Sequence, residues 1–287
     1  MKAGGGGHVL SRRGMRLGPR GRAAPAAVGP VVPAGHTLLF VGGLHRSGTT
    51  PLTRYLSSHP AMSAFSGTGV PEDEGQHLQD VYRTASAHGG PGRFAFARRA
   101  HLTESEALVN DRNRARLLGS WIPHWDSEKP IWVEKSPPNI IRTRFLNALF
   151  PHSAFVMVVR HPVEVALATR KWSRQRLDVL IEHWLVAHRI LLEDAERLQQ
   201  IVVVSYERLV EDAAGALAPL YAQLGVDPHP SDAGFRRSYA TRYRAEWLSF
   251  PEADQLDLFR RFEAGVNEFG YSLGPDWGSG PELSITR

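Results

Sequence analysis

The chain has 287 residues, 42% of them hydrophobic, which is enough to bury the core of one α/β domain. It has no cysteine, which excludes disulfide bonds, thiolate metal sites and a cysteine nucleophile. The net charge of +5 arises in residues 1–36, which hold basic but no acidic residues, so the rest of the chain is nearly neutral and we expect no nucleic-acid partner.

Residues 1–36 are rich in glycine and proline, and this composition predicts a disordered basic tail. The tail lacks the continuous apolar run of a signal peptide, and no later stretch is long enough to cross a membrane. We therefore expect a cytoplasmic protein with no membrane partner. Residues 37–287 are expected to form a single domain.

Short apolar runs alternate with helical patterns along this domain. Strands are predicted at 36–43, 61–65, 129–136, 153–160 and 201–206. Helices are predicted at 49–58, 103–118, from 163, from 177, at 207–224 and at 252–270, the second of them opened by a capping box at 103–106. Strands that alternate with helices indicate a three-layer α/β fold with a mainly parallel central sheet flanked by helices.

The segment 42–50, GGLHRSGTT, has the glycine spacing of a phosphate-binding G-x-x-x-x-G-K-[ST] loop. Thr49 stands where nucleotide triphosphatases need a lysine. Backbone N–H groups, the helix N-terminus and three hydroxyls can still form an anion site, and Arg46 adds a planar donor fork. The loop is therefore expected to bind a phosphate-like group through Arg46, Ser47, Gly48, Thr49 and Thr50.

Four of the predicted strands end in charged or hydroxyl groups. In parallel sheets of this kind, ligands bind beyond the carboxyl ends of the strands. The side chains that would meet at this edge are Arg46 and Ser47, Lys135 and Ser136, Arg160, and Ser205 and Tyr206.

An acidic segment, PEDEGQH at 71–77, follows the second predicted strand. Most acidic runs are solvated loops, but carboxylates near an arginine-rich edge can act as the general base for an acceptor hydroxyl. In extended backbone, Glu72 and Glu74 would share a face and Asp73 would point away.

No metal site is expected. His183 and His188 are five positions apart, off one helical face, and the chain has no H-E-x-x-H pattern. We interpret Trp172, Trp184 and Trp247 as core or pocket-lining residues.

Together these motifs resemble those of sulfotransferases that use 3′-phosphoadenosine 5′-phosphosulfate (PAPS). HRSGTT resembles their 5′-phosphosulfate loop, in the Arg-Ser-Gly-Thr-Thr form of tyrosylprotein and many bacterial sulfotransferases. VVRHPVEVALATRKW resembles their strand, turn and helix for the 3′-phosphate, and VEKSP and VVVSYERLVED match further family positions. The resemblance covers about residues 37–225.

The resemblance implies a P-loop-like fold and transfer of a sulfuryl group from PAPS to a hydroxyl of a small-molecule acceptor, with release of PAP and without a metal. Phenols, sugar hydroxyls and alcohols of bacterial metabolites would all fit as acceptors. Arg46 and Lys135 would flank the sulfuryl group, Arg160 would bind the 3′-phosphate, and Tyr206 would lie against the adenine. Because this donor has no γ-phosphate, the missing lysine is accounted for.

The chain departs from the family pattern near the expected site. The serine that usually follows the 3′-phosphate arginine by eight residues is Ala168 here, so Thr169 would have to substitute for it. Pro51 replaces the tryptophan that stacks on adenine in many cytosolic members. The base is a histidine in cytosolic members and a glutamate in tyrosylprotein and several bacterial members. Glu74 best suits the glutamate placement, and Glu72 and His77 follow.

Two other interpretations compete. The glycine spacing also fits a P-loop kinase or NTPase, although the lysine is absent. A catalytically inactive nucleotide-binding module that finds a partner through its basic tail is the third possibility.

Overall fold

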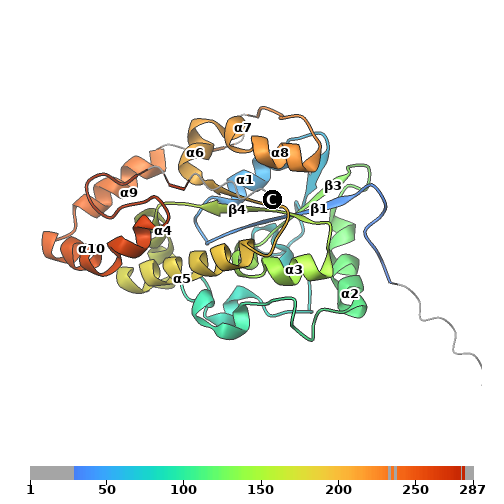
Figure 1. The fold of residues 1–287 in the computed structure, drawn as a ribbon, viewed down its shortest axis with the longest axis horizontal. Coiled ribbons are helices and arrows are strands. Elements are labelled where there is room, and N and C mark those ends of the chain that lie inside the picture. Colours follow the sequence, from blue (N-terminus) through green and yellow to red (C-terminus); the bar gives the residue numbers. More distant parts are fainter. Residues whose placement is uncertain (1–28, 232–233, 236–237, 279, 282–287) are drawn as a thin grey trace, which may run out of the picture.

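The computed structural model describes residues 29–231, 234–235, 238–278 and 280–281. Within them, five parallel strands form one sheet in the order β2-β3-β1-β4-β5 (Figure 1). The strands are β1 (Thr37–Gly43), β2 (Met62–Ala64), β3 (Ile131–Lys135), β4 (Ala154–Val159) and β5 (Ile201–Ser205). The predicted three-layer α/β fold with a parallel sheet is confirmed.

Helices cover both faces of the sheet (Figure 1). One face packs against α1 (Thr49–Ser57), α6 (Tyr206–Glu211) and α8 (Ala218–Leu224), with the short α7 (Ala213–Ala216) between the last two. The other face packs against α2 (Asp111–Trp121), α3 (Thr143–Leu149), α4 (Pro162–Ser173) and α5 (Leu177–Ala195). In addition, α9 (Ser238–Leu248) contacts α4, and α10 (Glu252–Asn267) contacts α5.

The strands are apolar throughout because both of their faces are buried. In β1, Leu39 and Val41 face the core under α1, whereas Leu38 and Phe40 face the core under α2 and α3. This alternation fixes the register of the strand. Because all strand pairs are parallel, each strand delivers its C-terminal residues to the same edge of the sheet.

Two helix predictions were wrong. The expected capping box at 103–106 forms only local turns, in which the Ser105 N–H donates to Thr103 Oγ1. The helix starts at Asp111 instead, because Asn110 Oδ1 caps the N–H of Asn113 at 2.9 Å.

The single helix expected at 207–224 is three helices. Asp212 leaves the helical conformation, with φ −149°, and caps the next short helix. Pro219 then sits in the first turn of α8, where its missing N–H costs no hydrogen bond.

Most of the predicted basic tail, residues 1–28, lies outside the described residues. From residue 29 the chain leads into β1, and the His36 ring lies 4.4 Å from the Trp132 ring. In the part that the structure describes, no helix has the length and apolar character needed to span a bilayer. The cytoplasmic location and the single domain at 37–287 stay predictions.

Candidate active site

The loop between β1 and α1 is shaped by two glycines. Gly48 has φ 111°, and a Cβ there would run into the Tyr206 ring. Gly43 has φ 150°, and a Cβ there would lie 2.6 Å from both Ser47 Oγ and the Val158 carbonyl oxygen. Side chains at either position would break the turn, so the backbone can wrap closely around the start of α1.

The hydroxyls of this loop do not all face the same way. Ser47 Oγ is fully buried and donates to the Leu44 carbonyl at 2.7 Å, so it braces the loop from inside. Thr49 is also buried. Thr50 lines pockets on both sides of α1. Of the three hydroxyl residues, Thr49 and Thr50 line the pocket beside the loop and can meet a ligand there, together with the N–H groups that the first turn of any helix leaves unbonded.

A pocket of about 390 Å³ opens beside the loop, and we term it the cationic pocket. Its positive side chains are Arg46, Arg160, Lys171 and Arg242. Its aromatic side chains are Trp172, Tyr206 and Tyr243. Cations and rings together suit a ligand that carries phosphate groups and a flat base.

Arg160 is held rigidly in this pocket. Its Nε donates to Glu164 Oε2 at 2.6 Å one helical turn further on, and its Nη1 donates to the Arg46 carbonyl at 3.4 Å. The guanidinium carbon lies 4.3 Å from the centre of the Tyr206 ring. Burial raises the pKa of Glu164, and the Arg160 charge opposes this shift. The ion pair with Glu164 therefore holds the Arg160 guanidinium at the end of β4, where the sequence analysis expected it.

The position expected for a hydroxyl on α4 is apolar. Ala168 lines the cationic pocket, whereas Thr169 Oγ1 lies 3.5 Å from the His45 carbonyl, which it faces as a donor. The structure does not bring Ser47 or Thr169 to the cationic pocket. The other residues predicted to bind the donor line this one pocket: Arg46, Gly48, Thr49, Thr50, Arg160 and Tyr206.

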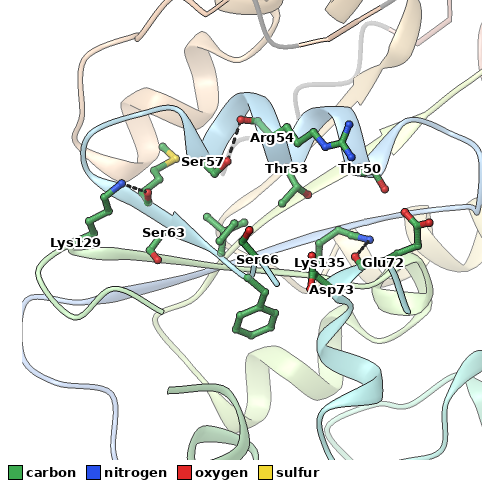
Figure 2. A pocket seen from close by; sticks show the side chains of 14 residues that line it. Thr50, Thr53, Arg54, Ser57, Ser63, Ser66, Glu72, Asp73, Lys129 and Lys135 are labelled. Atoms are coloured by element: carbon green, nitrogen blue, oxygen red, sulfur yellow. Dashed lines mark hydrogen bonds between the residues drawn. The ribbon is translucent and has the colours of Figure 1, made fainter. Parts of the chain in front are cut away.

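On the other side of Thr50 lies a second cleft, of about 460 Å³, which we term the polar cleft (Figure 2). Lys135, at the end of β3, and Glu72 lie at one end of it. The Lys135 side chain is 4% exposed, and its ammonium donates to the Glu72 carbonyl at 2.8 Å and to Glu74 Oε1 at 3.2 Å. A cation is thereby fixed next to the loop.

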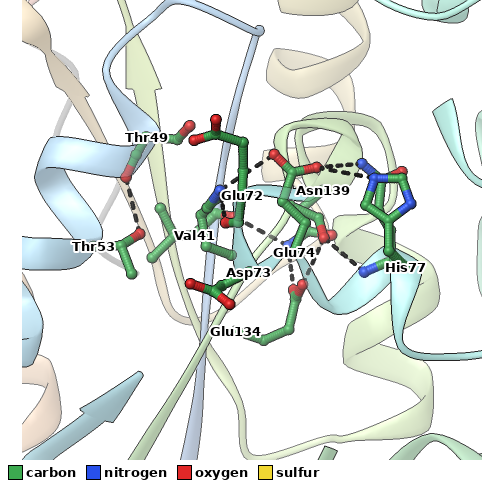
Figure 3. Close-up of polar contacts among 12 residues, drawn as sticks. Val41, Thr49, Thr53, Glu72, Asp73, Glu74, His77, Glu134 and Asn139 are labelled. Carbon is green, nitrogen blue, oxygen red and sulfur yellow. Dashed lines mark hydrogen bonds and ion pairs between the residues drawn. The ribbon is translucent and has the colours of Figure 1, made fainter. Parts of the chain in front are cut away.

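The backbone of the acidic segment 71–77 forms a turn, although extended backbone was expected. Glu72 and Asp73 have φ of 52° and 50°, in the left-handed region, so Glu72 and Glu74 do not share a face. Glu72 is exposed and lines the polar cleft together with Asp73. Glu74 is buried, accepts a hydrogen bond from Gln76 Nε2 at 2.6 Å, and lies 3.7 Å from His77 Nε2 (Figure 3).

Sequence reasoning missed the buried group that anchors this segment. Glu134 is fully buried and accepts hydrogen bonds from Ser136 Oγ and Asn139 Nδ2, both at 2.6 Å. Ser136 Oγ in turn accepts the N–H of Gln76 at 3.0 Å, which ties the segment to β3. Burial raises the pKa of Glu134 to about 7. The sequence signal for this group was Glu134 itself, a carboxylate directly after the apolar residues 131–133 of β3.

His45, also missed, lies in the loop itself. Burial and the neighbouring charges of Lys135 and Arg46 lower the pKa of His45 to about 3, so its ring is neutral at pH 7. It adds no positive charge to the site.

Within the described residues, no group of three or more His, Asp or Glu side chains is arranged to hold a metal ion. The sequence prediction that the reaction needs no metal stays a prediction.

Comparison with known structures supports the fold. The chain is similar to the sulfotransferase domain of the Synechococcus olefin synthase, with 19% identity, a TM-score of 0.51, and coverage of 85% of this chain and 99% of that domain. It is also similar to a Mycobacterium tuberculosis sulfotransferase, with 18% identity, a TM-score of 0.48, and coverage of 80% and 77%. No curated protein matches the chain in sequence.

The sequence itself decides the family. Residues 39–230, about two thirds of the chain, match the profile of the sulfotransferase family. This stretch contains the glycine loop, Lys135 and Arg160, and it decides against the kinase and NTPase interpretation. The chain belongs to the sulfotransferase family.

Proposed function

We propose that the chain transfers the sulfuryl group of PAPS to a hydroxyl of a small-molecule acceptor and releases PAP. The observation that carries this proposal is the pairing of two pockets across Thr50, one cationic and aromatic, the other holding a buried lysine and carboxylates. When bound, PAPS supplies an activated sulfuryl group, whose bond to the 5′-phosphate oxygen breaks as the acceptor oxygen bonds to sulfur.

The cationic pocket fits this donor. Arg160 would bind the 3′-phosphate, since its guanidinium is already oriented by Glu164. Lys171 and Arg242 would add positive charge beside it. The Tyr206 ring, which lies against Gly48, would pack on the adenine.

The start of α1 would receive the 5′-phosphate, whose charge rises as the sulfuryl group leaves. Thr50, Arg46 and the N-terminal amides of α1 would stabilise that charge, and Lys135 would do so from the polar cleft. Preorganised donors of this kind need no reorganisation during the reaction, and such positioning is the main source of catalysis in the related phosphoryl transfers.

We propose Glu74 as the general base that takes the proton of the acceptor hydroxyl. It is the carboxylate in contact with the Lys135 ammonium, so the base and the cation would act on neighbouring atoms. Glu72 is a second candidate, because its carboxylate lines the polar cleft. His77, at the edge of the same cluster, is a third.

The donor is tested by the thermal stability of the protein with PAP and, separately, with ATP and magnesium. We expect PAP alone to raise the melting temperature, by a free energy of about 2.7 kcal/mol at a hundredfold excess over Kd. A shift with ATP and magnesium but none with PAP would contradict the proposal. Production of PAP from PAPS with an acceptor panel then separates an enzyme from an inactive binding module.

A further inference from the structure

The polar cleft continues well past Lys135. It runs between α1 and the end of β2, and Lys129 lies at the opposite end from Lys135 and Glu72 (Figure 2). If sulfuryl transfer occurs at Lys135, the rest of this cleft is where the body of the acceptor would lie. Its lining therefore reports which class of acceptor it accommodates.

Hydroxyl groups run along the cleft. Thr50, Thr53 and Ser57 occur at spacings of three and four residues, on one side of α1, and Ser66 lies across from them beyond the end of β2 (Figure 2). Ser63 also lines the cleft, but its hydroxyl oxygen accepts the N–H of Asp126 at 2.8 Å. Thr53 Oγ1 donates to the Thr49 carbonyl and Ser57 Oγ donates to the Arg54 carbonyl, so these two bonds use the hydroxyl protons and leave oxygen lone pairs to accept from a ligand.

A positive charge lies at the end of the cleft away from Lys135. The Lys129 ammonium donates there to the Met62 carbonyl at 3.1 Å, whereas the Arg54 side chain extends along α1 toward Thr50 (Figure 2). Among the described residues, neither side chain makes an ion pair. The two carboxylates of the cleft belong to the other end, where Asp73 is held by Thr68 at 2.6 Å.

An apolar acceptor would fit this lining poorly. A hydrocarbon ring system would remove water from hydroxyls and cations without replacing their hydrogen bonds, which is unfavourable for each group left unpaired. A polyhydroxylated ligand satisfies the hydroxyl row, and an anionic group on it would pair with Lys129.

We propose that the acceptor is an anionic sugar, carrying a phosphate or a carboxylate, with its reacting hydroxyl at Lys135 and its anionic group at Lys129. This rests on the proposed function: the sugar oxygen bonds to sulfur, the bond to the 5′-phosphate oxygen breaks, and the hydroxyl proton goes to the base. Lys129 acts in binding the acceptor and takes no part in binding the donor.

The test compares four probe acceptors with saturating PAPS: glucosamine 6-phosphate, glucuronic acid, methyl glucoside and 2-naphthol. We expect the first two to have the highest kcat/KM, and their ratio distinguishes phosphate from carboxylate. Lys129→Gln should raise KM for the anionic sugars by about tenfold or more and leave methyl glucoside unchanged. Lys129→Arg should restore most of the loss. Arg99→Gln, which removes an exposed cation outside both pockets, is the matched control.

Binding of glucosamine 6-phosphate to the PAP complex, measured by calorimetry, gives a readout independent of turnover. The proposal is overturned if 2-naphthol is the preferred acceptor, if Lys129→Gln affects all acceptors equally, or if the PAP complex does not bind the sugar phosphate. In each of these cases an intact melting shift with PAP keeps the sulfotransferase proposal standing. Loss of that shift in the unaltered protein would contradict the proposed function instead.

Discussion

The guanidinium of Arg46 lies over the indole of Trp172, with Cζ 3.2 Å from the ring centre. Trp172 is 54% exposed, whereas the other six tryptophans are at most 9% exposed. Both side chains line the cationic pocket. If Arg46 binds the 5′-phosphosulfate group of the donor, donor binding must alter the contact between Arg46 and Trp172.

PAP is therefore expected to change the intrinsic tryptophan fluorescence, and Trp172→Phe should remove most of the change. The physical reason is that Trp172 is the indole at the pocket wall, while the others are enclosed in the protein. Titration of PAP into both proteins provides the measurement. A full fluorescence response in the Phe variant, with unchanged Kd, would contradict contact between donor and Trp172.

Arg160 is expected to bind the 3′-phosphate, so its removal should weaken PAP but hardly affect adenosine 5′-phosphosulfate, which lacks that phosphate. A charged hydrogen bond of this kind contributes about 1.5–3 kcal/mol, or a factor of roughly 10 to 150 in Kd. Arg160→Met alone would leave Glu164 buried without its partner. The double change Arg160→Met with Glu164→Gln avoids this, and equal losses for both ligands would remove Arg160 from the proposed role.

Ala168→Ser should strengthen PAP binding. Ala168 lines the cationic pocket at the position where the family usually has serine, and a hydroxyl there adds a donor for the 3′-phosphate. Thr169→Ala is the matched control, since its hydroxyl faces the His45 carbonyl. The Kd for PAP of both variants is measured by calorimetry. If Thr169→Ala weakens PAP binding by more than Ala168→Ser strengthens it, the hydroxyl that binds the 3′-phosphate is that of Thr169.

Sequence reasoning worked best where residues end a buried strand. Lys135 is the last residue of β3 and Arg160 directly follows β4. Parallel strands carry their ends to one edge, so the placement of both residues at that edge could be predicted without coordinates. The glycine loop is equally local, because its shape depends on Gly43 and Gly48 themselves.

The polar cleft could not be predicted in this way. Arg54, Ser63 and Lys129 belong to separate segments that only the folded sheet brings together. The prediction for the acidic segment was wrong for a different reason. Left-handed backbone conformations at Glu72 and Asp73 turn the side chains of Glu72 and Glu74 apart, and no residue pattern indicated this.

The free energy of unfolding should fall as pH drops below about 6.5. Burial lowers the pKa of four histidines, to about 3 or about 4, so they stay neutral in the folded protein while they become protonated in the unfolded chain: His45, His161, His183 and His188. The unfolded state then binds more protons, and each group contributes a slope of about 1.4 kcal/mol per pH unit in this window.

Three glutamates oppose this trend. Burial raises the pKa of Glu134 and Glu207 to about 7, and it also raises the pKa of Glu164. Between about pH 4.5 and 7 the folded state binds the extra protons of these carboxyls, so their contribution to the free energy of unfolding falls as pH rises. Four histidines outweigh three glutamates near pH 5.5. Urea unfolding at pH 5.0, 5.5 and 6.0 measures the slope, and His188→Gln should reduce it by about 1.4 kcal/mol per pH unit. An unchanged slope would show that His188 is not held neutral.

Substitution of Glu74 tests its proposed role as the general base. An acceptor hydroxyl is a weak nucleophile and needs a proton acceptor within about 2.6–3.2 Å in the reactive complex. Glu74→Gln keeps the size of the side chain and an oxygen for Lys135, yet it removes the proton acceptor. We expect kcat to fall by about 10²–10⁴ while the Kd for PAP is preserved. Acceptors with a more acidic hydroxyl should lose less, since they need less help in releasing the proton.

Glu72→Gln and His77→Gln are the matched variants, because both residues lie in the same segment and neither side chain is bonded to Lys135. Glu72 meets Lys135 through its backbone carbonyl, which substitution retains. If Glu74 is the base, these two variants keep kcat within a few fold, and Glu74→Gln alone causes the large loss. A near-normal kcat in Glu74→Gln, together with a collapse in Glu72→Gln, would transfer the role to Glu72. Glu74 would then be a positioning residue that holds the Lys135 ammonium beside the loop.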